Sequence, residues 1–180
     1  MRAGILALQG GVVEHARLVE ALGHDAVLVR RPESLRGLDA LILPGGESTT
    51  LLRLLDLIGL REPLIEAASR LPTLGTCAGL VILAALGVLD ADVERNAFGP
   101  QVDSASADLE WKGAPLTAAL IRAPAVTRVG AGVDVCSTYA DPARPGRSPR
   151  VVGVEEGSVM AVSYHPELTG DATLHRLLLA

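Results

Sequence analysis

The alternation of short apolar runs with helical segments in the first half of the chain constrains its fold more than any other feature. Four runs have the length and apolar character of strands buried on both faces, namely Ala3–Leu8, Asp25–Arg30, Asp39–Leu43 and Thr73–Gly75. Apolar side chains recur at helical spacing in Val12–Leu22, Thr49–Ile58, Arg61–Leu71 and Ala78–Leu86. Strands that alternate with helices pair in a parallel sheet. The sequence therefore predicts an α/β fold.

The second half of the chain predicts mainly strands joined by short turns. The expected strands are Val88–Ala97, Gln101–Trp111, Leu116–Ile121, Ala125–Val129, Val133–Ser137, Val151–Glu155 and Ser158–Tyr164. The last two flank Glu156-Gly157, which favours a hairpin turn. We expect an exposed loop over Tyr139–Arg150 and a closing helix over Asp171–Leu179, with Asp171 as its N-cap. The 180 residues are expected to form a single domain over residues 1–180.

Composition and charge exclude several classes of function. The net charge of −5 gives a surface that repels phosphate backbones, so we expect no nucleic-acid binding. The longest apolar run, Leu80–Leu89, is about half of the ~20 residues that span a bilayer, and the N-terminal run is too short for a signal peptide. The two cysteines form no metal-binding pattern, so we expect no metal, and a cytoplasmic protein with free thiols.

The most specific local motif is Gly75-Thr76-Cys77-Ala78-Gly79. It is the thiol counterpart of the G-x-S-x-G elbow, in which the nucleophile lies on a strained strand-to-helix turn between small residues. A strand is expected before Cys77 and a helix after it, and a helix N-terminus favours the reactive thiolate. The motif indicates a nucleophilic Cys77. A buried structural cysteine behind a glycine turn is the alternative for this pentapeptide alone.

A histidine and a carboxylate occur together in Tyr164-His165-Pro166-Glu167. In an extended segment, residues two apart point to the same side, so His165 and Glu167 are expected to meet. His165 could take the proton from Cys77 while Glu167 fixes the imidazole tautomer. Taken alone, the motif also fits a surface loop with a solvated glutamate. The order Cys, His, Glu favours a catalytic triad.

A double glycine follows a predicted buried strand in Pro44-Gly45-Gly46-Glu47-Ser48-Thr49. Glycine lets the backbone turn its N–H groups outward, where with the N–H of Ala78 they could bind an oxyanion. The alternatives are a loop that caps a helix, with Ser48 as N-cap, and a phosphate loop. A phosphate loop would need a Gly-Lys-Ser/Thr ending, which is absent.

With these motifs, the sequence resembles the class I (triad) glutamine amidotransferases, and within them the branch of the glutaminase subunits of pyridoxal 5′-phosphate synthase. The matching stretches cover almost the whole chain: Leu8–Gly10, Leu43–Thr50, Gly75–Gly79, Val93–Gly99, Gln101–Ser104, Ile121–Pro124 and Ser163–Thr169. The resemblance implies a three-layer α/β fold of the flavodoxin-like type, with a mixed, mostly parallel central sheet.

The resemblance also implies a reaction and its residues. Cys77 would attack the side-chain amide of L-glutamine, His165 would act as base and acid, and Glu167 would orient it. Water would release L-glutamate from a γ-glutamyl thioester, without a cofactor. The residues that bind glutamine in this family correspond here to Gly46, Glu47, Ser48, Arg95, Ile121 and Arg122, and the oxyanion hole to Gly46 and Ala78. From the sequence alone, Arg95 and Arg122 also fit ordinary surface ion pairs.

A partner is implied as well. The ammonia would pass to a (β/α)₈-barrel pyridoxal 5′-phosphate synthase subunit in a large hetero-oligomer, and Gln9 lies in the region that this family uses at the interface. Two other function classes remain open: a stand-alone thiol hydrolase, such as a γ-glutamyl peptidase, and an inactive scaffold that regulates a partner. Release of ammonia from free glutamine distinguishes the first, and labelling by a glutamine-like electrophile distinguishes the second.

Overall fold

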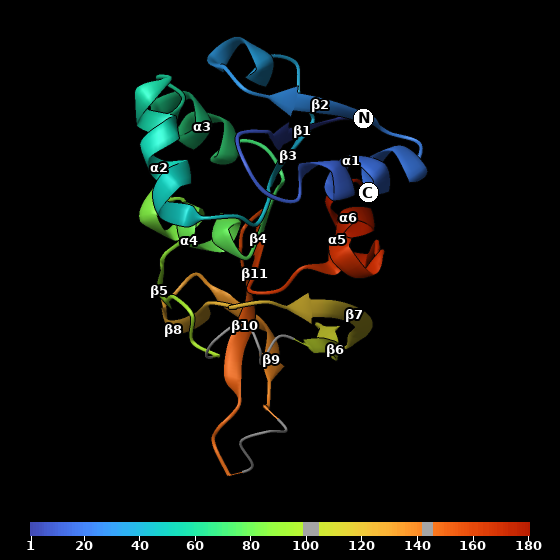
Figure 1. The fold of residues 1–180 in the computed structure, drawn as a ribbon, viewed down its shortest axis with the longest axis vertical. Helices are drawn as coiled ribbons and strands as arrows, with labels where there is room; N and C mark the ends of the chain where they lie inside the picture. The colour runs from blue at the N-terminus through green and yellow to red at the C-terminus, as the bar shows by residue number, and fades with distance from the viewer. Residues whose placement is uncertain (99–104, 142–145) are drawn as a thin grey trace.

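The computed structural model describes residues 1–98, 105–141 and 146–180, and its centre is a mixed sheet (Figure 1). The strands of the sheet lie in the order β2-β1-β3-β4-β11-β10-β8-β5, and β9 pairs with β10. The five strands from β2 to β11 are parallel, and those beyond β11 pair antiparallel. The strands β6 and β7 form a separate antiparallel hairpin. The predicted α/β fold with a mixed, mostly parallel sheet is confirmed.

The strands have the bounds β1 Arg2–Leu6, β2 Asp25–Val29, β3 Ala40–Leu43, β4 Thr73–Thr76, β5 Ala91–Glu94, β6 Ala105–Trp111, β7 Ala114–Leu120, β8 Ala125–Val129, β9 Asp134–Tyr139, β10 Arg150–Glu156 and β11 Val159–Val162. The helices are α1 Val12–Ala21, α2 Ser48–Leu57, α3 Arg61–Ala68, α4 Ala78–Ala85, α5 Pro166–Thr169 and α6 Thr173–Leu178, with a 3₁₀ turn, η1, at Pro32–Leu35. Each of the four helices expected in the first half is present and ends one to three residues earlier than predicted.

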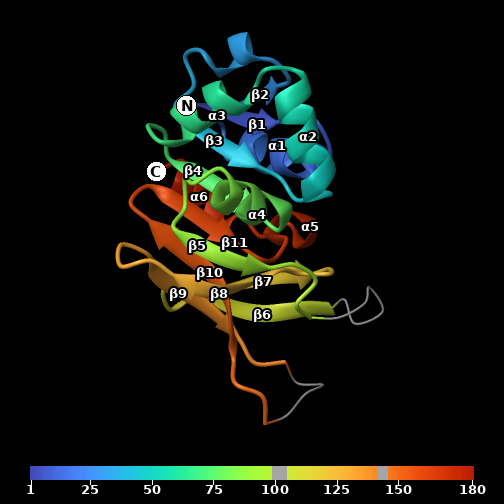
Figure 2. The ribbon, with the colours of Figure 1, turned by 90° about the vertical axis from the view of Figure 1, so that its left-hand side faces the viewer.

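Helices cover both faces of the sheet and make three layers. Figure 1 shows α2, α3 and α4 on one side of the parallel strands and α1, α5 and α6 on the other, and Figure 2 shows the sheet from the side of α2. Successive side chains of β3 point to opposite faces of the sheet. Leu41 and Leu43 pack in the cluster with α2 to α4, and Ile42 packs in the cluster with α1 and α6. Both faces of the strand are therefore buried, which explains its unbroken apolar sequence.

Several expected boundaries in the second half are wrong. The strand predicted over Val88–Ala97 begins only at Ala91, because the N–H groups of Val88 and Leu89 donate to the carbonyl of Leu83 at the end of α4. Residues 101–104 of the strand predicted from Gln101 lie outside the described residues. The hairpin at Glu156-Gly157 is confirmed, with Gly157 at a φ of 58°.

The expected loop Tyr139–Arg150 and the expected N-cap Asp171 also need correction. Tyr139 and Arg150 pair with each other across β9 and β10, so the connection is shorter than predicted. Ala172, not Asp171, is the N-cap of α6. The carboxylate of Asp171 accepts hydrogen bonds from the backbone of Thr117 and Thr173. Asp171 therefore links β7 to the start of α6, although it precedes the N-cap residue by one position.

The strand order places four loops at one edge of the sheet. The order β2-β1-β3-β4-β11 is that of flavodoxin-like sheets, in which ligands bind beyond the carboxyl ends of the strands. Gln9 follows β1, Gly45 follows β3, Cys77 follows β4 and His165 follows β11. The parallel half of the sheet thus brings together residues that are up to 156 positions apart.

No helix among the residues that the structure describes is long and apolar enough to cross a membrane.

Candidate active site

Cys77 lies on the predicted turn between a strand and a helix. It is the N-cap of α4, directly after β4, and its φ of 47° is in the left-handed region that non-glycine residues rarely adopt. Gly79 permits this turn, because a Cβ there would lie 2.0 Å from the carbonyl oxygen of Leu43. The motif is therefore a nucleophile elbow in its geometry: a strained, partly exposed residue at a helix N-terminus between small neighbours.

His165 and Glu167 meet beside this turn, although not in the predicted manner. The segment is not extended, because His165 is the N-cap of the short helix α5, which contains Glu167. The two side chains still form a hydrogen bond, with 2.7 Å between Nδ1 of His165 and Oε1 of Glu167, and both are nearly fully buried. The short helix was missed since Pro166 at its first position reads equally well as an extended residue.

The imidazole of His165 lies close to Cys77 as well as to Glu167. A Cβ on Gly45 would lie 2.2 Å from Cε1 of His165 and 3.2 Å from Cβ of Cys77, so the glycine lets the ring lie against the β3 loop. Burial alone would lower the pKa of His165, but its contacts with Cys77 and Glu167 and the charge of Glu167 raise it above its ordinary value. The geometry therefore favours a proton on the imidazole.

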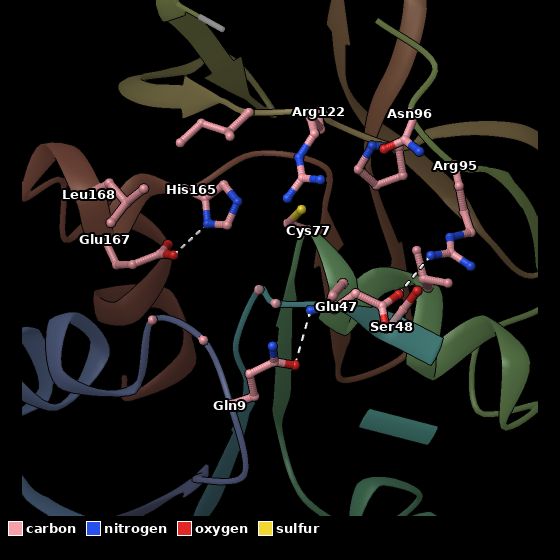
Figure 3. A pocket seen from close by; sticks show the side chains of 18 residues that line it. Gln9, Glu47, Ser48, Cys77, Arg95, Asn96, Arg122, His165, Glu167 and Leu168 are labelled. Atoms are coloured by element: carbon pink, nitrogen blue, oxygen red, sulfur yellow. Dashed lines mark hydrogen bonds and ion pairs between the residues drawn. The ribbon is translucent and has the colours of Figure 1, made fainter. Parts of the chain in front are cut away.

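A pocket of about 370 Å³ opens above Cys77, which is within the usual size for small-molecule sites (Figure 3). Every residue that the sequence singled out for the site lines it: Gln9, Gly46, Glu47, Ser48, Cys77, Ala78, Arg95, Ile121, Arg122, His165 and Glu167. Figure 3 shows Cys77 between His165 on one side and Glu47, Ser48 and Arg95 on the other. The structure thus brings all of them together around one cavity.

Glu47, rather than the expected Ser48, caps helix α2. Its carboxylate accepts hydrogen bonds from the backbone N–H groups of Thr49 and Thr50, while Ser48 is the first helical residue and is buried at the pocket. The same carboxylate pairs with Arg95, at 2.9 Å. The hydrogen bonds from Thr50 and Thr49 lower the pKa of Glu47 to about 2. Glu47 is therefore ionised and fixes the guanidinium of Arg95 at the rim of the pocket.

Backbone strain is concentrated at the pocket. Among the described residues, the non-glycine positions with positive φ are Cys77, Asn96, Lys112 and Arg122. All of these except Lys112 line the pocket. Strained residues persist where the surrounding structure holds them, often at functional sites. Asn96 was not singled out from the sequence. Its position next to Arg95 is a signal that could have been used, because asparagine tolerates a positive φ better than most residues.

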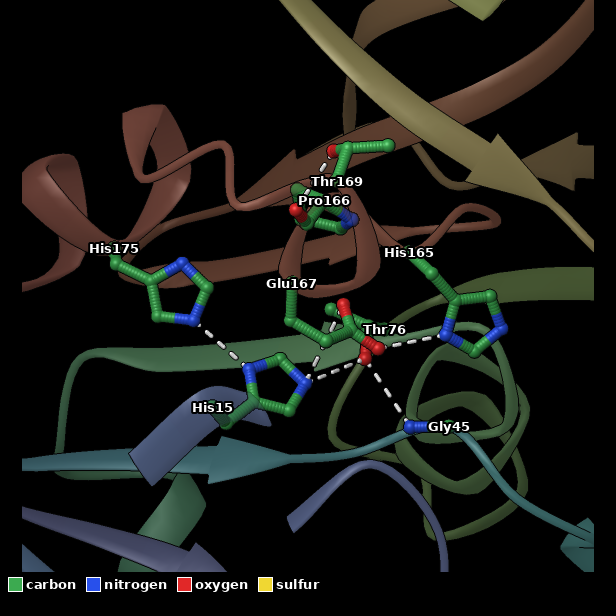
Figure 4. A network of polar contacts seen from close by, with 8 residues as sticks. All are labelled: His15, Gly45, Thr76, His165, Pro166, Glu167, Thr169 and His175. Atoms are coloured by element: carbon green, nitrogen blue, oxygen red, sulfur yellow. Dashed lines mark hydrogen bonds and ion pairs between the residues drawn. The ribbon is translucent and has the colours of Figure 1, made fainter. Parts of the chain in front are cut away.

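A buried histidine pair, which no sequence motif indicates, lies behind the triad (Figure 4). Nδ1 of His15 lies 2.8 Å from Nε2 of His175, and Nε2 of His15 lies 3.1 Å from Oγ1 of Thr76. Burial, together with the charges of nearby histidines, lowers the pKa of His15 well below its ordinary value. Burial lowers the pKa of His175 to about 4. Both rings are therefore neutral at pH 7.

The neutral histidine pair predicts a loss of stability in acid. The unfolded chain takes up a proton on each histidine below a pKa of about 6.5, whereas folded His175 resists protonation down to about pH 4. The stabilising contribution is therefore complete above pH 6.5 and is lost as the pH falls towards 4. For His175, we expect the free energy of unfolding to fall by about 2 kcal/mol between pH 8 and pH 5.

Urea unfolding at the two pH values measures this difference. The His175→Gln variant, which cannot titrate in this range, should lose about that much of the pH dependence. An equal pH dependence in the parent and in His175→Gln would contradict the prediction.

Comparisons with known proteins find relatives that match nearly the whole chain and solved structures that share its fold. A pyridoxal 5′-phosphate synthase subunit PdxT from Geobacillus kaustophilus (strain HTA426) is 47% identical over 190 residues, covering 99% of this chain and 91% of the relative. The subunit of the same name from Corynebacterium jeikeium (strain K411) is 48% identical, covering 99% and 95%. A solved structure described as a glutamine amidotransferase is 43% identical with a TM-score of 0.88, covering 98% and 96%. PurLQS from Thermotoga maritima, at 18% identity and a TM-score of 0.72, covers 92% and 87% and shares the fold.

A three-layer α/β sheet with a cysteine elbow beside a histidine–glutamate pair is the arrangement of the triad glutamine amidotransferases. Within this class, the chain belongs to the SNO glutamine amidotransferase family, whose model matches residues 5–179.

Proposed function

We propose that this chain hydrolyses L-glutamine to L-glutamate and ammonia, and that it supplies the ammonia to the synthase subunit of pyridoxal 5′-phosphate synthase. The observation that carries the proposal is the row of Cys77, His165 and Glu167 at the wall of a pocket of about 370 Å³, with His165 and Glu167 hydrogen-bonded at 2.7 Å. The family and the names of the relatives support the same activity.

The proposed reaction has two steps that share one histidine. The thiolate of Cys77 attacks the side-chain amide carbon of glutamine, and the imidazolium of His165 gives its proton to the departing nitrogen, so that ammonia leaves and a γ-glutamyl thioester remains. Water then attacks the thioester carbon, His165 takes a proton from the water, and the thiolate leaves as glutamate forms. Glu167, bonded to Nδ1, keeps Nε2 of the imidazole directed at the reacting atoms.

Backbone N–H groups of Gly46 and Ala78 are proposed to bind the oxyanion. Both residues line the pocket, and Ala78 begins α4, where N–H groups have no partner within the helix. The loop that carries Gly46 is held by a hydrogen bond from the N–H of Gly45 to Oγ1 of Thr76, at 3.1 Å. Each such donor typically contributes about 3–4 kcal/mol to stabilising the transition state.

The charged groups at the rim are proposed to select free glutamine. Its α-carboxylate needs a cation, and its α-ammonium needs acceptors. Arg95 is already paired with Glu47, whereas the guanidinium of Arg122 lines the pocket with no ion pair among the described residues. Arg122 is therefore the stronger candidate for the α-carboxylate, and Gly46, Glu47, Ser48 and Ile121 complete the proposed binding surface.

The synthase partner is proposed to dock at the loop of Gln9. Oε1 of Gln9 accepts a hydrogen bond from the backbone N–H of Glu47, at 3.3 Å, so this exposed side chain contacts the loop of the oxyanion donors. We propose that residues 1–180 act as one amidotransferase domain bound to a (β/α)₈-barrel subunit in a large hetero-oligomer. Both cysteines are free thiols, which supports action in the reducing cytoplasm.

We expect the isolated chain to be a poor glutaminase that the synthase subunit activates by about 10²–10³-fold, the value of one oxyanion donor. A glycine peptide rotates at low cost, so the Gly45-Gly46 peptide can present either its N–H or its C=O to the substrate. The carbonyl oxygen of Gly45 lies against Gly10, where a Cβ would be 1.6 Å away. A partner that contacts the Gln9–Gly10 loop could therefore select one orientation.

The rate of glutamate production with and without purified synthase measures this activation. Full activity without the synthase would refute the activation while leaving the glutaminase function intact. Glutamate release from a γ-glutamyl peptide but not from free glutamine would favour a stand-alone thiol hydrolase. Failure of a glutamine-like electrophile to label Cys77 in the complex would favour an inactive scaffold.

A further inference from the structure

Two buried histidines lie next to the proposed triad but take no part in the hydrolysis. His15 in α1 and His175 in α6 have no exposed surface, and neither lines the pocket. Figure 4 shows them on the side of Glu167 that faces away from His165. A buried imidazole is costly unless its nitrogens are bonded, so this pair needs an explanation.

His15 contacts the carboxylate oxygen that the triad leaves free. Oε1 of Glu167 bonds to His165, whereas Oε2 is buried with no hydrogen-bond partner among the described residues. Nε2 of His15 is 3.6 Å from that Oε2, and 3.1 Å from Oγ1 of Thr76. The ring of His15 therefore lies between the triad carboxylate and the residue that precedes the nucleophile.

The contacts determine where the ring protons lie. Both histidines are neutral, so each carries one N–H. A lone pair on Nε2 of His15 would face a carboxylate, so we assign the proton to Nε2. Nδ1 of His15 then accepts from Nε2 of His175, at 2.8 Å. This assignment leaves Nδ1 of His175, which has no partner in the described part of the chain, as an unprotonated nitrogen rather than a buried N–H.

Thr76 extends these contacts to the oxyanion loop. Its hydroxyl oxygen accepts from the backbone N–H of Gly45, at 3.1 Å, as well as from His15. Gly45 is the residue before Gly46, the proposed oxyanion donor. One imidazole thus supports both the carboxylate that orients His165 and the hydroxyl that holds the oxyanion loop.

We propose that His15 is a positioning residue for the hydrolysis. It holds Glu167 directly, and the Gly45-Gly46 loop through Thr76, in the positions that the reaction requires. This role rests on the proposed glutaminase function. His175 fixes the tautomer of His15, so the unit runs from α6 through α1 to the carboxyl ends of β3 and β4. His15 acts through its neighbours and does not touch the substrate.

Two replacements of similar polarity separate the two ring nitrogens. In His15→Gln, the side-chain amide nitrogen reaches the place of Nε2 and keeps the donor to Glu167 and Thr76. In His15→Asn, the amide nitrogen reaches only the place of Nδ1, so this donor is lost. For the complex with its synthase, we expect His15→Asn to lower kcat for glutamine by about 10- to 100-fold, since small misplacements cost up to about 10²-fold. KM should stay within about twofold, and His15→Gln should stay within about threefold of the parent.

A buried residue on the same helix controls for general loosening. Val19, one turn after His15, is fully buried and belongs to the apolar cluster on this face of the sheet. If His15 has only a structural role, Val19→Ala should lower kcat as much as His15→Asn at a matched loss of melting temperature. Equal kcat values for His15→Asn and His15→Gln would also overturn the proposal.

Thr76 supplies a second pair of variants if His15→Asn does not fold. Thr76→Ser keeps the hydroxyl, and Thr76→Val keeps the shape without it. We expect only Thr76→Val to lose kcat, and equal rates for the two would overturn the role of the network. The parent complex is the reference in each assay: a parent that releases no glutamate would overturn the proposed function and this role together, whereas an active parent with unaffected variants overturns the positioning role alone.

Discussion

Replacing Cys77 with alanine is expected to abolish glutamine hydrolysis by the complex, with a loss of about 10⁶-fold, the size seen when a triad nucleophile is removed. The sulfur is the only atom at the elbow that can form the thioester, and the strained turn places it in the pocket beside His165. Alanine keeps the Cβ, and the turn is held by Gly79 against Leu43 rather than by the sulfur. The fold should therefore survive.

The second cysteine is the matched control. Cys136 in β9 is buried away from the pocket, and burial raises the pKa of its thiol to about 11. Such a thiol is a poor nucleophile. Cys136→Ala should therefore keep the parental rate of glutamate production. Comparable glutaminase activity in Cys77→Ala would refute the assignment of the nucleophile.

Added ammonium salt separates the two halves of the proposed function. A complex of synthase with Cys77→Ala subunits should form no product from glutamine, because no ammonia is released. It should still form product from ammonium salt, since the synthase does not need the thiol. Loss of both reactions would indicate that the substitution disturbs assembly rather than chemistry.

The first half of the fold could be predicted because its signals are local. Each parallel strand is short and apolar on both faces, and the helices between them show their periodicity within ten residues or so. Because these strands alternate with helices and pair in parallel, their carboxyl ends lie at the same edge of the sheet. For this reason the candidates Gln9, Gly46 and Cys77 could be expected at one edge of the sheet before any contact was known.

The second half was less predictable because its boundaries depend on distant partners. Val88 and Leu89 have the sequence of a strand, but the end of α4 takes their N–H groups. The hairpin of β6 and β7 is separate from the central sheet, and no local sequence pattern predicts this separation. Its residues Trp111 and Leu116 pack in the core with α1 and α6. Tertiary packing decides such cases over strand propensity.

In the site, motifs predicted the residues but not the network around them. Cys77, His165 and Glu167 each lie in a short recognisable motif. His15 and His175 are 160 positions apart and neither lies in one of these motifs, and only the fold brings Nδ1 of His15 to 2.8 Å from Nε2 of His175. Similarly, Glu47 was expected in the binding surface, yet its role in capping α2 depends on its extended backbone, which the sequence does not reveal.

Removing His165 should cost nearly as much as removing Cys77, whereas removing the charge of Glu167 should cost less. In His165→Ala, nothing delivers a proton to the leaving ammonia or takes one from water, so we expect a loss of about 10⁶-fold in kcat. In Glu167→Gln, the shape is kept and the imidazole still faces the thiol, but its tautomer and charge lose support. We expect a loss of about 10⁴-fold.

The double variant tests whether the residues act as a unit. Glu167 acts only through His165, to which its Oε1 is bonded at 2.7 Å. Once His165 is gone, the carboxylate has no imidazole to orient, so His165→Ala combined with Glu167→Gln should be no slower than His165→Ala alone. Steady-state glutamate production by each complex gives the four rates. If the loss of rate in the double variant equals the product of the losses in the two single variants, Glu167 contributes independently of His165. A parental rate for His165→Ala would exclude His165 as the base.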